Sequence, residues 1–64
     1  MTLTELENLP KETLTAEQVS NVYPFHPQAI RMMAREGRFP TPVAVHGSRV
    51  HILKRPFIKY MKGE

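Results

Sequence analysis

Apolar residues recur at helical spacing in the stretch that follows Leu14. Thr15 can cap a helix there, because its hydroxyl and the Gln18 side chain can each bond the backbone N–H of the other residue. We therefore predict that this helix begins at Ala16. One side of it is apolar: Ala16, Val19, Val22 and Tyr23. Pro24 ends it, since a proline in the interior would remove a backbone hydrogen bond.

A second helix is predicted from Pro27 to Glu36, since proline suits the first helical position and Gly37 the position just past the end. Its apolar side carries Ile30, Met33 and Ala34. The opposite arc carries Gln28, Arg31, Met32 and Arg35. Residues 24–26 alone separate the two predicted helices, which must therefore meet at a sharp angle, as in a helix-turn-helix. Phe25 is the expected plug beneath the turn.

A β-hairpin is predicted around Gly47-Ser48, a two-residue loop with glycine first, as in a type II′ turn. This loop pairs His46 with Arg49, Val45 with Val50, Ala44 with His51 and Val43 with Ile52. Because side chains alternate along a strand, one face is apolar: Val43, Val45, Val50 and Ile52. The other face is more polar: Ala44, His46, Arg49 and His51. Phe39, in the proline-rich stretch before the hairpin, should turn inward.

The two ends of the chain differ in the strength of their signals. In residues 1–13, Thr4 with Glu7 and leucines at positions 3, 6 and 9 allow one or two helical turns before Pro10, and a mobile N-terminal arm is the alternative. Near the C-terminus, Pro56 fits the first turn of a last helix. Its apolar stripe closes the core: Phe57, Ile58, Tyr60 and Met61. Lys59 and Lys62 should stay solvated.

The predicted fold class is α+β: two helices, a two-stranded wing hairpin and a C-terminal helix. The arm covers residues 1–13, the domain residues 14–62 and a tail residues 63–64. Sixty-four residues make one domain with a small core and no room for an enzyme cleft of ordinary size. The chain has no cysteine, no apolar run near the ~18 residues of a membrane span and an acidic start. We expect a soluble cytoplasmic protein.

Charge is distributed unevenly along the chain. Residues 1–23 hold one lysine against four glutamates, a local charge of −3, whereas residues 24–63 hold eight lysines and arginines against one glutamate, a local charge of +7. Such a split predicts a polyanionic partner for the C-terminal two thirds. The arc of the second helix suits DNA, because arginine matches guanine O6 and N7 or a phosphate, and glutamine matches adenine. A solvated basic face is the alternative reading.

The sequence gives little indication of a metal site or a catalytic site. His46 and His51 share the outer face of the predicted hairpin, but they stand diagonally with no third ligand nearby in sequence, so we expect no zinc site and no cofactor. No Ser/His/Asp or paired-carboxylate arrangement can be drawn, and Glu17 and Glu36 fit helix surfaces. We expect that the protein is not an enzyme.

Four runs of residues together resemble a known family. They are Leu14-Thr15-Ala16-Glu17-Gln18-Val19, Phe25-His26-Pro27-Gln28-Ala29-Ile30-Arg31, Arg35-Glu36-Gly37-Arg38-Phe39-Pro40 and the Val-x-Val-x-Gly-x-Arg-x-x-Ile hairpin. Over about residues 14–62 this pattern resembles the excisionase and mercury-resistance-regulator-like winged helix-turn-helix family. The chain departs from it at His26, where the family prefers a serine cap, at Pro24, often glycine, and at Met33, often tryptophan.

The resemblance implies a double-stranded DNA-binding protein. The helix from Pro27 to Glu36 would enter the major groove, and the wing tip would lie along the minor groove or backbone. The expected DNA contacts of the helix are His26, Gln28, Arg31, Met32 and Arg35. Those of the wing and its flanks are Arg38, His46, Gly47, Ser48, Arg49 and His51. Lys54, Arg55, Lys59 and Lys62 would at most support phosphate binding.

Small members of this family resemble excisionases of prophages and mobile elements. By that resemblance, the protein would bind near an attachment site in a bacterial cell, self-associate cooperatively on DNA, bend it, and direct a tyrosine-type integrase toward excision. A small phage or plasmid transcription regulator of the same fold is the alternative. A third possibility is a protein-interaction module in which the acidic N-terminal segment and a small apolar surface dock on a partner.

Overall fold

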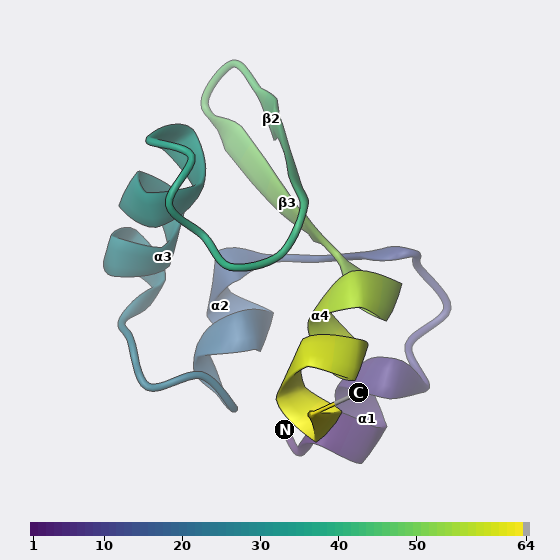
Figure 1. The fold of residues 1–64 in the computed structure, drawn as a ribbon. Coiled ribbons are helices and arrows are strands. Elements are labelled where there is room, and N and C mark those ends of the chain that lie inside the picture. Colours follow the sequence, from purple (N-terminus) through teal and green to yellow (C-terminus); the bar gives the residue numbers. More distant parts are fainter. Residues whose placement is uncertain (64) are drawn as a thin grey trace.

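The computed structural model describes residues 1–63, which form a small α+β domain of four helices and a three-stranded antiparallel sheet (Figure 1). The helices are α1 (Leu3–Glu7), α2 (Ala16–Ser20), α3 (Pro27–Arg35) and α4 (Lys54–Lys62). The strands are β1 (Thr13–Leu14), β2 (Val43–His46) and β3 (Arg49–Leu53), with β3 in the centre of the sheet. The α+β class is confirmed, and the sheet has one strand more than predicted.

The first thirteen residues belong to this packed unit. Thr2 caps α1: its hydroxyl accepts from the Glu5 N–H at 3.2 Å, and the Glu5 carboxylate accepts from the Thr2 N–H at 2.9 Å. The cap therefore lies two residues before the predicted pair of Thr4 and Glu7. Leu6 is completely buried in the core. Of the two alternatives for this segment, the structure has the helical one.

Strand β1 is the extra strand of the sheet. Thr13 pairs with Leu53 and Leu14 with Ile52, so β1 covers the edge of β3 that the hairpin leaves open. Two residues are too few to produce a period-two pattern. The pairing also joins segments far apart in the sequence, so no local signal predicted it.

Helix α2 begins as predicted but ends earlier. Thr15 and Gln18 make the expected capping box, with hydrogen bonds of 2.9 and 3.1 Å, whereas the helix stops at Ser20 instead of running to Tyr23. Phe25 is 46% exposed, so its predicted place beneath the turn is wrong. The Tyr23 ring lies there instead, with its centre 5.5 Å from that of Phe39 and 6.1 Å from that of Phe57.

Helix α3 ends through a Schellman motif. Gly37 has a φ of +73°, its N–H donates to the Ala34 carbonyl at 3.2 Å, and the Arg38 N–H donates to the Met33 carbonyl at 2.8 Å. These bonds satisfy two of the last carbonyls of the helix. Ile30 and Ala34 are buried against the rest of the core, which leaves the other side of α3 facing outward.

The hairpin of β2 and β3 has the predicted register: His46 pairs with Arg49, Val45 with Val50, Ala44 with His51 and Val43 with Ile52. Gly47 has a φ of +59° whereas Ser48 has no positive φ, which agrees with a type II′ turn. The tip of the hairpin extends beyond the helices (Figure 1). For this reason Val45 is 42% exposed, although the pattern placed it on the apolar face.

Helix α4 packs against the core through the buried side chains of Phe57 and Ile58. The buried apolar residues come from all parts of the chain: Leu6, Leu14, Ala16, Val19, Ile30, Ala34, Phe39, Val50, Ile52, Phe57 and Ile58. Tyr60 is about half exposed and does not join the predicted stripe. Gly63 caps α4 in a left-handed conformation, and the other residue of the predicted tail, position 64, lies outside the described residues.

Candidate nucleic-acid interface

The outward side of α3 presents the polar arc that the sequence predicted. Gln28, Met32 and Arg35 are exposed and Arg31 is partly exposed. His26 is the exposed N-cap of α3, and its side chain makes no capping hydrogen bond, which fits the departure from a serine at this position. Gln28, Arg31, Met32 and Arg35 therefore occupy one side of a helix that is about 13.5 Å long, and His26 lies at the turn before it.

Arg31 is not free of acidic neighbours, contrary to what the helix alone suggested. Its Nη2 forms an ion pair with Oε2 of Glu17 on α2, and its Nη1 lies 3.4 Å from Oε1 of Gln28. Glu17 was expected to be a simple surface residue. A helical wheel of α2 alone would show only that Glu17 is on the polar side of that helix. The angle between α2 and α3 places Glu17 next to Arg31.

Arg35 and Arg38, at the C-terminal end of α3, differ in whether they have an ion-pair partner. Among residues 1–63, Arg35 has neither an ion pair nor a side-chain hydrogen bond, and it lies in the last turn of α3, where the helix dipole favours a cation. Arg38 pairs with Glu36. Together with Phe25 and Met32, Arg38 also lines a shallow depression on the side of α3. Arg35 is thus the cation of α3 that is most available to a ligand.

The hairpin tip carries a second cation of this kind. Arg49 is exposed, and over the part of the chain that the structure describes it has no acidic partner; Gly47, Ser48 and His46 beside it are exposed too. His51 lies farther down the hairpin, partly buried in a depression that it shares with Lys11 and Gln18. His51 therefore lies beside the N-terminal segment, Arg38 follows α3, and His46, Gly47, Ser48 and Arg49 lie at the tip.

The two histidines of the hairpin are neighbours but do not form a metal site of ordinary composition. Their ring centres are 6.2 Å apart. Across residues 1–63, no group of three or more His, Cys, Asp or Glu side chains is placed to hold a metal ion. A structural zinc site needs four ligands and a catalytic one three.

Helix α3 and the hairpin meet at one end of the molecule. Helix α3 contacts both strands, and Figure 1 shows the C-terminal turn of α3 and the hairpin tip at the same end. We call this surface, the outward arc of α3 with residues 46–49, the α3–hairpin face. It includes arginines of two elements that contact each other, Arg35 on α3 and Arg49 on β3, and the partly engaged Arg31.

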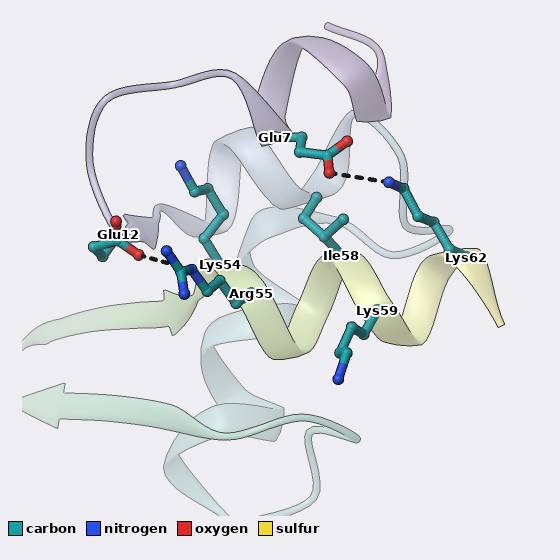
Figure 2. Close-up of a pocket in the computed structure, with 7 residues that line it drawn as sticks. All are labelled: Glu7, Glu12, Lys54, Arg55, Ile58, Lys59 and Lys62. Carbon is teal, nitrogen blue, oxygen red and sulfur yellow. Dashed lines mark hydrogen bonds and ion pairs between the residues drawn. The ribbon is translucent and has the colours of Figure 1, made fainter. Parts of the chain in front are cut away.

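The cations of α4 form a different surface. Helices α1 and α4 lie at the end of the molecule opposite the hairpin tip (Figure 1). There Arg55 Nε lies 3.6 Å from Glu12, and Lys62 Nζ lies 2.9 Å from Glu7, on the walls of a groove of about 370 Å³ (Figure 2). Lys54 was expected at most to support phosphate binding, but it is buried and its Nζ donates to the Leu9 carbonyl at 2.6 Å.

The basic charge of the C-terminal two thirds is therefore divided between two ends of the molecule. Two of the four α4 cations, Arg55 and Lys62, pair with glutamates of the acidic N-terminal segment, which contributes α1 and the chain leading to β1. At the α3–hairpin face, Arg35 and Arg49 have no such matching acids among the described residues. Of the exposed cations on α3, the hairpin and α4 that have no acidic partner among residues 1–63, two therefore lie on the α3–hairpin face and one, Lys59, lies on α4.

The chemistry of the α3–hairpin face is that of recognition by hydrogen bonds and charge. Arginine guanidinium groups offer paired donors, the Gln28 amide offers a donor and an acceptor, and Met32 offers an apolar contact. A planar anion or the edge of a nucleic acid base pair would match these groups.

Comparison of the chain with protein-family models, with curated proteins and with solved structures finds no match. Within residues 1–63, none of the helices combines the length and the apolar character that crossing a membrane requires.

Proposed function

We propose that this protein binds double-stranded DNA through the α3–hairpin face, as a small winged helix-turn-helix protein. Helix α3 would enter the major groove, and the hairpin would act as the wing against the neighbouring backbone or minor groove. The observation that carries the proposal is the position of Arg35 and Arg49, two exposed arginines without ion-pair partners among residues 1–63, on elements that contact each other.

The dimensions of the domain support this use. A major groove about 12 Å wide admits an α-helix. The domain measures 28 Å along its longest axis, which corresponds to about eight base pairs at a rise of about 3.4 Å. One copy would therefore cover less than a helical turn of DNA. Several copies on adjacent sites, with cooperative self-association, would be needed to cover a longer recognition sequence.

The ion pair between Arg31 and Glu17 is compatible with this proposal. Both side chains reach solvent, with 32% and 62% of their surfaces exposed, and exposed pairs of this kind contribute about 0–1 kcal/mol. A phosphate or a guanine can take the place of the carboxylate at little cost. Arg31 then acts beside Arg35 as a base or phosphate contact, with Gln28 and Met32 at the neighbouring base pairs.

The proposed biological role is that of an excisionase of a phage or mobile element, which would bend DNA near an attachment site and direct a tyrosine-type integrase toward excision. This part rests on the resemblance of residues 14–62 to that family. A transcription regulator of the same fold uses the same face. The neighbouring genes distinguish the two: an adjacent integrase gene supports the excisionase, and a divergent promoter without one supports the regulator.

A binding titration with matched variants tests the DNA-binding proposal. A preferred duplex is first selected from a randomised pool, and its affinity is compared with that of a shuffled duplex. We expect the parent protein to prefer the selected duplex, and Arg35→Ala to weaken this binding by about 1–3 kcal/mol if Arg35 reads a base. Lys59→Ala, which removes a charge on α4, should have a much smaller effect. Equal losses in the two variants, or binding of no duplex, would contradict the proposal.

A further inference from the structure

We infer that Glu17 is a specificity-determining residue, which holds Arg31 away from DNA until a matching base pair displaces it. The inference rests on the proposed function and concerns the regulation of the same face. Its basis is that a carboxylate from α2 already occupies an arginine that the proposed function assigns to DNA. The carboxylate would stand in for a DNA phosphate, so that a phosphate alone gains little by replacing it.

In the structure the Arg31 guanidinium has two hydrogen-bond acceptors, the same number that a guanine would offer it. Nη2 has Glu17 Oε2 as its acceptor, and Nη1 has Gln28 Oε1 at 3.4 Å. A guanine offers two acceptors, O6 and N7, to the same guanidinium. A phosphate can also bond both nitrogens, but it exchanges one anion for another, whereas O6 and N7 of a guanine are presented at a fixed spacing and orientation that only a matching base pair supplies. The exchange at a guanine therefore depends on the DNA sequence, whereas the exchange at a phosphate does not.

The charge of Glu17 has a second effect in the same direction. Its carboxylate is 62% exposed on α2, next to the helix that would enter the groove. When a duplex approaches without offering Arg31 a better partner, this carboxylate stays paired with Arg31 and neutralises its charge, so that Arg31 adds little to the attraction of the phosphates. Non-specific affinity comes almost entirely from such backbone electrostatics. Glu17 should therefore lower non-specific affinity more than specific affinity.

A different role would be to buttress Arg31, in which case Glu17 would stay bonded to it in the complex and fix its orientation for base reading. The structure favours competition, because Arg31 is only 32% exposed and lies toward α2, with both terminal nitrogens occupied by side chains of the protein. Buttressing of an outward-pointing guanidinium would leave those nitrogens available. On removal of the carboxylate, competition predicts tighter binding of a shuffled duplex, whereas buttressing predicts weaker binding of the selected duplex alone.

The test compares Glu17→Gln with Glu12→Gln, in the parent and in the Arg31→Ala background. Glu12 is a matched control because it is also an exposed glutamate that pairs with an arginine, Arg55, but at the α1–α4 end. At low salt we expect Glu17→Gln to tighten binding to a shuffled duplex about threefold to fivefold and to reduce the preference for the selected duplex. Glu12→Gln should change either affinity less than twofold, and in Arg31→Ala the effect of Glu17→Gln should largely disappear.

Several outcomes would overturn the inference while leaving the proposed function in place. Equal effects of Glu17→Gln and Glu12→Gln would reduce the role of Glu17 to its contribution to net charge. An undiminished effect in Arg31→Ala would show that Glu17 does not act through Arg31. Weaker binding of the selected duplex alone would show buttressing. Binding of no duplex by the parent protein would instead overturn the proposed function itself, and thermal unfolding of each variant verifies that it is folded.

Discussion

Raising the salt concentration from 50 to 200 mM should weaken the binding of this protein to duplex DNA about 150-fold. Four arginines lie on the α3–hairpin face or at its edge: Arg31, Arg35, Arg38 and Arg49. If each arginine in the complex neutralises the charge of one phosphate, whether it bonds that phosphate or an adjacent base edge, log affinity falls with log salt with a slope of about −3.6. A fourfold increase in salt then gives the stated loss.

The same calculation predicts the effect of removing the arginine at the hairpin tip. Arg49→Ala should reduce the slope to about −2.7, so that the same change in salt weakens binding only about 40-fold. Lys59→Ala is the matched control, because it removes one positive charge from α4, at the opposite end of the molecule. Its slope should equal that of the parent protein.

Fluorescence anisotropy with a labelled duplex at five or more salt concentrations measures these slopes. Arg31 and Arg38 begin in ion pairs with Glu17 and Glu36, so a parent slope near −1.8 would mean that both pairs persist in the complex. A slope near zero would refute binding through phosphates. Equal reductions in Arg49→Ala and Lys59→Ala would refute the assignment of the binding face.

Three further predictions concern the fold. Leu6→Ala should lower the free energy of unfolding by about 2–5 kcal/mol in urea titrations, since Leu6 is completely buried, and an unchanged value would mean that α1 is not packed in solution. His26→Ser should raise it by about 1 kcal/mol, because the N-cap of α3 has no side-chain hydrogen bond; no gain would contradict this reading of the cap. An NMR titration should place the pKa of Glu5 below its ordinary value, because the Thr2 backbone N–H and hydroxyl favour the carboxylate, and an ordinary pKa would contradict the capping box. The stabilisation from Glu5 should be present above the ordinary carboxyl pKa and be lost as the pH falls through the lowered one.

Local chemistry predicted the elements whose signals lie within a few residues. Thr15 with Gln18 gave the start of α2, Pro27 with Gly37 gave α3 to within one residue, and Gly47-Ser48 gave the full register of the hairpin. In each case a cap or a turn restricts the backbone by itself, because its hydrogen bonds join residues close together in the sequence.

Features that depend on contacts between distant residues were not predicted. The pairing of β1 with β3 and the hydrogen bond from Lys54 to Leu9 both join the N-terminal segment to the other end of the chain. That Tyr23 instead of Phe25 packs against the core depends on where Phe39 and Phe57 lie. Such contacts are determined by packing in three dimensions, and the pattern of apolar and polar positions along the chain does not predict them.

The candidate site was predicted in composition but only partly in its interactions. The pattern placed Gln28, Arg31, Met32 and Arg35 on one side of a helix, and the structure agrees. It did not reveal that Glu17 reaches Arg31, because that contact depends on how two helices cross. It also did not reveal that the cations of α4 lie at the other end of the molecule, where Arg55 pairs with Glu12 and Lys62 with Glu7.

The most direct test of the proposed DNA-binding face is a map of backbone amide chemical shifts on ¹⁵N-labelled protein titrated with a selected duplex. The proposal predicts that the largest changes fall on the outward side of α3 and on residues 46–49, while the amides of α1 and α4 change little. Changes centred on the groove between α1 and α4, or no changes at saturating duplex, would contradict it.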